Sequence, residues 1–96
     1  MAGYLNVDLI VAALIGAEHH PVEHLLSAAE RGEQELRIQE VALYYAFCCL
    51  QSDDRFNLPR FCRLLSCARV IPSPRPFEMP TLEEIANWRH AALEGS

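Results

Sequence analysis

The spacing of hydrophobic residues changes along this chain between the period of a strand and the period of a helix. Glu35–Gln39 alternates polar and apolar side chains, which is the pattern of a half-buried strand. The apolar run Val41–Leu50 follows almost directly. We interpret it as a helix buried on most faces, and its valine and aromatic content leaves a strand as the alternative. Strands that alternate with helices pair in parallel, so this pattern predicts an α/β fold.

Two further strands complete the predicted sheet. Tyr4–Val7 is short and apolar, and Ala68–Ile71 precedes a proline-rich crossing that cannot be helical. The expected architecture is a three-layer domain with a short parallel sheet of about three strands flanked by about five helices. Ligands of such sheets bind beyond the carboxyl ends of the strands. Functional residues are therefore expected after Val7, Gln39 and Ile71.

The starts and ends of the predicted helices carry capping residues. The candidate N-caps are Asn6 or Asp8 before Leu9–Ile15, His20 with Pro21, Asn57 with Pro59, and Thr81 with Glu84 as a capping box. Gly16 follows the first of these helices, where a left-handed residue is favoured. Asp8 can thus be explained as a cap without any metal.

The length and the apolar runs limit where this chain acts. It has 96 residues, which suits a single domain over residues 1–96 with one hydrophobic core. No apolar run approaches the roughly 18 residues of a membrane-spanning helix. The first basic residue is Arg31, so the N-terminus does not resemble a signal peptide. We expect a cytoplasmic protein without a membrane partner.

The charge balance makes a general nucleic-acid coat protein a poor interpretation. The net charge is -5, and all eight basic residues are arginine. One basic cluster stands out, formed by Arg55, Arg60, Arg63 and Arg69. It is either a solvated helix face or a surface that binds RNA or an acidic partner.

Three other groups of reactive side chains favour structural roles. His20 and His24 have helical spacing, but no third zinc ligand lies at a usual distance along the chain. Cys48, Cys49, Cys62 and Cys67 do not form the CxxC pairs of a structural zinc site, so we interpret them as reduced, packed thiols. Tyr44 and Tyr45 could stack on bases, although the apolar run around them favours core positions.

Four strings, taken in order, resemble the PIN domain family, the metal-dependent ribonucleases that include many toxins of toxin–antitoxin pairs. The strings are Tyr4–Leu14, Glu18–Leu26, Leu36–Ala46 and Phe77–Ala86, and together they cover nearly the whole chain. They are similar to the first strand and helix, the second helix, the second strand with the third helix, and the capped fifth helix of that family. The resemblance implies a PIN-like fold, a Mg²⁺ or Mn²⁺ site and an RNA substrate.

The metal-binding acids of the family are largely missing here. Its leading Asp falls on Asn6, and Asp8 could move the charge by two residues. Its helical Glu falls on Tyr45, and Glu40 lies about 140° away around a helix. The further acids of the family belong to a fourth strand, which the sequence up to Ser96 does not contain. The candidate catalytic residue is therefore Asp8, and the candidate metal ligands are Asp8 and Glu40.

These departures predict a degenerate or C-terminally truncated PIN-like domain that acts as a protein or RNA interaction module. The missing strand would leave a bare sheet edge, so we expect a homodimer through that edge, or an antitoxin-like protein partner that covers it. The alternative is a Mg²⁺- or Mn²⁺-dependent ribonuclease whose other acids lie outside this chain or on a second subunit. A third interpretation is a small helical oligomerisation domain.

Overall fold

A computed structural model describes residues 2–16, 20–51, 56, 58–73 and 78–94 of the chain. Three strands, β1 (Ala2–Tyr4), β2 (Glu35–Gln39) and β3 (Ala68–Ile71), form a parallel sheet in the order β1-β2-β3. The helices are α1 (Val7–Ile15), α2 (Pro21–Glu30), α3 (Glu40–Cys49), α4 (Leu58–Cys67) and α5 (Leu82–Glu94). The predicted α/β fold with a three-stranded parallel sheet and five helices is confirmed.

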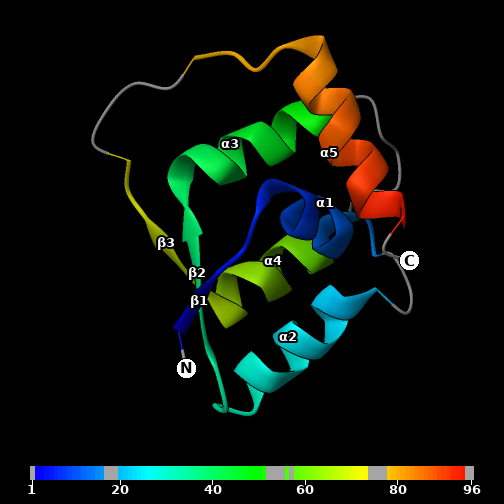
Figure 1. Cartoon of the computed structure of the whole chain (residues 1–96). Helices are drawn as coiled ribbons and strands as arrows, with labels where there is room; N and C mark the ends of the chain where they lie inside the picture. The colour runs from blue at the N-terminus through cyan, green and yellow to red at the C-terminus, as the bar shows by residue number, and fades with distance from the viewer. Residues whose placement is uncertain (1, 17–19, 52–55, 57, 74–77, 95–96) are drawn as a thin grey trace.

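The order of the strands places the connecting helices on one face of the sheet. Right-handed crossovers between consecutive parallel strands lie on the same side when strand order follows chain order. Leu36 and Ile38 of β2 are buried on that side, whereas Glu35 and Gln39 are exposed. In Figure 1 the strands lie at the left and the helices to their right. The described part of the opposite sheet face is therefore open to solvent.

Helix α1 lies at the centre of the core and contacts α3, α4 and α5. Its buried residues are Val7, Ile10, Val11, Ala12, Ala13 and Leu14. The helix ends at Gly16, whose φ of 70° is in the left-handed region that favours glycine. The guanidinium of Arg60 from α4 packs directly against Gly16, so any side chain there would displace it. A cation in this position also suits the negative end of the α1 dipole.

The start of α1 corrects one prediction. The expected strand Tyr4–Val7 ends at Tyr4, and Val7 is already helical. Asn6 is the N-cap residue by its extended backbone, and its side chain makes no capping hydrogen bond. Asp8 therefore lies within the first helical turn, where the helix dipole favours an acid, and the prediction that it caps the helix is wrong.

Other local predictions are confirmed. The strands β2 and β3 have their expected bounds. The Nδ1 atom of the buried His20 accepts the backbone N–H of Val22 at 3.1 Å, with Pro21 in the first turn of α2. Thr81 and Glu84 form the capping box, because each backbone N–H donates to the other side chain, at 3.2 and 3.1 Å. The predicted cap at Asn57 lies outside the described residues.

Helix α3 is less buried than expected. Of its residues only Ala46 and Cys49 are buried, and Phe47 is exposed at its surface. Phe47 makes edge contacts with the rings of Phe56 and Phe61, 6.1 and 5.3 Å between centroids. The prediction of a helix buried on most faces is therefore wrong, because α3 lies at the rim of the helical layer. No described helix has the length and apolar character that crossing a membrane requires.

The cysteines differ in their surroundings, and this difference predicts different rates of alkylation. Cys49 is buried, which raises the pKa of its thiol to about 11, with a contribution from Cys48, whereas Cys62 is exposed. Alkylation requires the thiolate, so at mildly alkaline pH we expect iodoacetamide to modify Cys62 first and Cys49 only after unfolding. Peptide mass spectrometry over a time course measures both rates. Equal rates in the native protein, with a urea-unfolded sample as control, would contradict the expectation.

Candidate functional site

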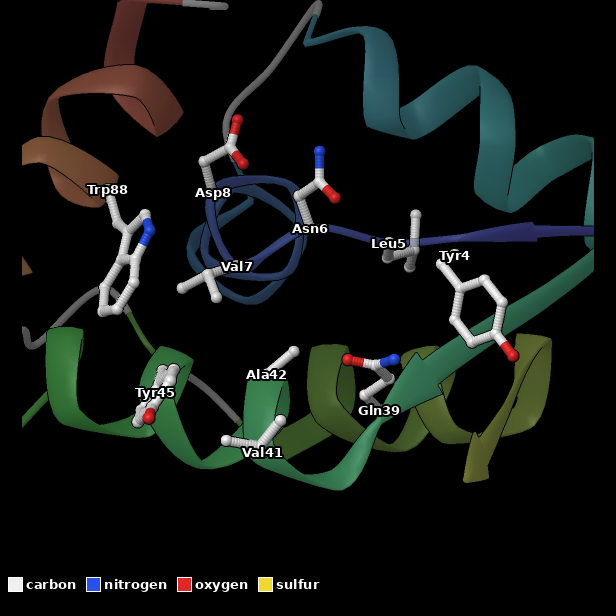
Figure 2. Close-up of a pocket in the computed structure, with 10 residues that line it drawn as sticks. All are labelled: Tyr4, Leu5, Asn6, Val7, Asp8, Gln39, Val41, Ala42, Tyr45 and Trp88. Carbon is white, nitrogen blue, oxygen red and sulfur yellow. The ribbon is translucent and has the colours of Figure 1, made fainter. Parts of the chain in front are cut away.

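A cleft of about 670 Å³ lies at the carboxyl ends of β1 and β2. Its lining consists of Tyr4, Leu5, Asn6, Val7, Asp8, Gln39, Val41, Ala42, Tyr45 and Trp88, drawn in Figure 2. This is the position that the parallel sheet predicts for a ligand site. Helices α1 and α3 start here because β1 and β2 both end at this edge, and α5 supplies Trp88 from the far end of the chain.

The turn from β1 into α1 contributes Asn6 and Asp8. The extended backbone of Asn6 leaves its exposed amide without a capping bond, and Asp8 is half-buried in the first turn. Figure 2 shows both side chains pointing in the same direction, away from Val41 and Ala42 of α3. The two polar groups therefore form one rim of the cleft and do not face its apolar floor.

An aromatic pair closes one end of the cleft. The rings of Tyr45 from α3 and Trp88 from α5 stack with centroids 5.2 Å apart and an angle of 17° between their planes. Both side chains are half-buried, so each ring keeps part of its surface open to solvent. Tyr44 is tilted against Tyr45, and its hydroxyl donates to the Sδ atom of Met79 at 2.9 Å. Tyr45 packs against the core as expected and also forms a wall of the cleft, whereas Tyr44 is not part of the core.

The opposite end of the cleft carries Tyr4 and Gln39. Gln39 is the last residue of β2 and the N-cap of α3, yet its side chain makes no capping hydrogen bond. The hydroxyl of Ser73, after β3, instead accepts the backbone N–H of Val41 at 3.1 Å. Because Ser73 accepts a backbone N–H at the start of α3, the side-chain amide of Gln39 is not used as a cap and is available to a ligand in the cleft. Two amides and a phenol thus supply hydrogen-bonding groups along the rim.

Among the residues that the structure describes, Asp8 is the only acid that lines the cleft. Glu40 begins α3 directly after Gln39, but it is exposed and does not line the cleft. Over the residues with described positions, no three His, Cys, Asp or Glu side chains come together as a metal-ligand set. The structure thus brings Asn6, Asp8 and Tyr45 together on the lining of one cleft, which does not include Glu40.

The predicted basic cluster does not form one surface. Arg63 of α4 pairs with Glu23 and Glu30 of α2 at 2.8 and 2.7 Å, and these hydrogen bonds raise the pKa of its guanidinium. Arg60 lies 3.9 Å from Glu23 and joins the same network. Both arginines therefore hold α4 against α2. Arg69 is on the open face of β3, away from this network, and Arg55 lies outside the described residues.

Trp88, Gln39 and Tyr4 were not among the predicted site residues. The packing of α5 on α1 and α3 brings Trp88 to the cleft, and no local sequence pattern indicates this. The position of Gln39 at the end of a predicted strand could have identified it as a site residue. No family model, curated protein or solved structure matches this chain.

Proposed function

We propose that this chain is a PIN-like domain that binds single-stranded RNA in the strand-end cleft without hydrolysing it. The observation that carries the proposal is the stacked pair of Tyr45 and Trp88 at one end of a cleft whose lining also includes the amides of Asn6 and Gln39. Unpaired bases stack on aromatic side chains, and amide groups pair with the hydrogen-bonding edges of bases. A flat aromatic wall with polar groups along the rim suits a nucleobase.

The cleft has too few acids for metal-dependent phosphodiester hydrolysis. Metal-dependent cleavage requires several carboxylates that hold the ion and lower the pKa of a bound water. Of the described residues the cleft offers Asp8 as its one acid, and Asn6 and Tyr45 stand where the resembled family has acids. A Mg²⁺- or Mn²⁺-dependent ribonuclease completed by acids from elsewhere is the rival proposal.

The proposed compartment is the cytoplasm, where RNA and reduced thiols occur together. All four cysteines are free of disulfides, as is usual in reducing compartments. Among the described strands β1 pairs only with β2, so its other edge also suits pairing with a second copy of this chain or with an antitoxin-like protein. RNA experiments are therefore best performed at a concentration where light scattering defines the oligomeric state.

The chain contains a single tryptophan, which makes the proposal directly testable. We expect a short single-stranded oligouridylate to quench the fluorescence of Trp88 saturably in the presence of EDTA, because the base stacks on the indole. The matched control is a duplex RNA of equal length, whose bases are already stacked.

Two results would decide against the proposal. Absence of quenching by the single strand would exclude base binding in this cleft. Cleavage of the same RNA after addition of Mg²⁺ or Mn²⁺, prevented by EDTA and abolished in Asp8→Ala, would establish the rival ribonuclease.

A further inference from the structure

The open face of the sheet carries a row of side chains across all three strands. Tyr4 of β1 is in register with Arg37 of β2, and Arg37 is in register with Arg69 of β3. Side chains alternate along a strand, and the neighbours of Arg37, Leu36 and Ile38, are buried on the opposite face. One phenol and two guanidinium groups therefore lie side by side on the exposed surface.

The members of this row are accessible and partly held in place. Tyr4 is 53% exposed, and Arg69 is also exposed. Hydrogen bonds to the hydroxyl of Tyr4 and the carboxylate of Glu35 raise the pKa of Arg37, and its distance to Glu35 is 3.5 Å. Arg37 thus lies beside the hydroxyl of Tyr4, while Arg69 adds a second guanidinium group on the next strand.

The row is continuous with the cleft. Tyr4 belongs to both, because it lines the cleft and begins the row. Gln39, two residues beyond Arg37 on the same side of β2, also lines the cleft. A ligand that leaves the cleft past Tyr4 and Gln39 therefore reaches the guanidinium groups of Arg37 and Arg69 without crossing a helix.

We infer that the row Tyr4–Arg37–Arg69 extends the cleft into a binding track for the same single-stranded RNA, with a base on Tyr4 and phosphates at the two arginines. The inference rests on the proposed function, and it adds the polymeric nature of the ligand and its path across the sheet. Arginine binds phosphate oxygens in a bidentate manner, and stacking on an aromatic ring tolerates any base. Arg69 and Arg37, the latter paired with Glu35 on the same open face, offer two guanidinium groups to a polyanion even though the whole chain is acidic.

The track predicts that affinity depends on RNA length and on Arg69. A uridine dinucleotide reaches only the cleft, whereas a decanucleotide also covers the row, so the decanucleotide should bind more tightly. Each phosphate contact to a single strand contributes a salt-dependence slope of about 0.7 in log K against log salt, or on the order of fourfold in affinity at physiological salt. In Arg69→Glu the ratio of decanucleotide to dinucleotide affinity should fall at least by this factor, and the salt slope should decrease.

The matched control is Arg31→Glu, which changes the net charge equally at an exposed arginine paired with Glu33 at the end of α2. Trp88 fluorescence reports binding, and circular dichroism confirms that each variant folds; Arg69→Gln replaces Arg69→Glu if the latter does not. Retention of the length dependence in Arg31→Glu and its loss in the Arg69 variant would support the track.

The possible failures are distinguishable. Equal losses in both variants, or equal affinities for the two oligonucleotides in the unchanged protein, would overturn the track and leave base binding in the cleft intact. Absence of binding by both oligonucleotides would overturn the proposed function and the track together.

Discussion

Replacement of Trp88 by alanine is expected to weaken the binding of single-stranded RNA roughly 5- to 150-fold. Stacking of one base on an aromatic side chain contributes about 1–3 kcal/mol by alanine substitution, and about 1.4 kcal/mol corresponds to tenfold in affinity. Trp88 is half of the stacked pair with Tyr45, so its removal leaves a single ring at this end of the cleft. The substitution also eliminates the intrinsic fluorophore, so the affinity is measured by anisotropy of a labelled decanucleotide.

Two variants separate a binding effect from a folding effect. Trp88→Phe keeps an aromatic face and should retain most of the affinity. Leu82→Ala removes an 86% exposed side chain at the start of the same helix and should bind RNA as the unchanged protein does. Thermal unfolding of all variants shows whether the cleft wall is still folded. Unchanged affinity in folded Trp88→Ala would mean that the aromatic wall does not contact the RNA.

Replacement of Ile10 by alanine is expected to lower the free energy of unfolding by about 2–5 kcal/mol, the usual cost of truncating a fully buried aliphatic side chain. Ile10 has no exposed surface, and its helix is packed between α3, α4 and α5, so the vacated volume has little room to collapse. Since the free energy of unfolding of a single domain is about 5–15 kcal/mol, this substitution removes a substantial fraction of it.

Urea unfolding followed by far-ultraviolet circular dichroism measures this loss. Leu82→Ala is again the matched control, because exposed substitutions usually change stability by less than about 0.5 kcal/mol. Similar midpoints for the two variants would contradict the central position of α1. Because α1 also presents Asn6 and Asp8, a folded Ile10→Ala protein additionally shows whether small shifts of this helix alter the cleft.

The sequence predicted correctly those features of the fold that a few neighbouring residues determine. Glu35–Gln39 and Ala68–Ile71 were predicted with their observed bounds, because alternation and a following proline are local features. The capping box at Thr81 is likewise contained within four residues. The boundary between β1 and α1 was misplaced, since the apolar residues continue from Leu5 into the helix and only the backbone conformation of Asn6 marks the change.

The candidate site depended more on tertiary packing. Asp8 and Glu40 were the candidate metal ligands, and the structure places Asp8, with Asn6 and Tyr45, on the lining of the cleft but not Glu40. Trp88 joins them from a distant part of the sequence, which no periodicity could indicate. Arg60 and Arg63 were grouped with Arg69 because they are neighbours in sequence, but their partners are the acids of α2. Proximity along the chain cannot show which charges are already neutralised.

The central position of α1 has a consequence for how the chain reaches its native state during synthesis. The ribosome makes α1 early, but the helices that cover it include α3 and α5, and α5 comes after every other element. A nascent chain that has completed β2 already has the partner for β1, yet its most apolar helix still lacks part of its cover. The hydrophobic surface of α1 therefore remains accessible to chaperones until α5 emerges. Helix α1 thus depends on a helix that is synthesised much later for part of its cover.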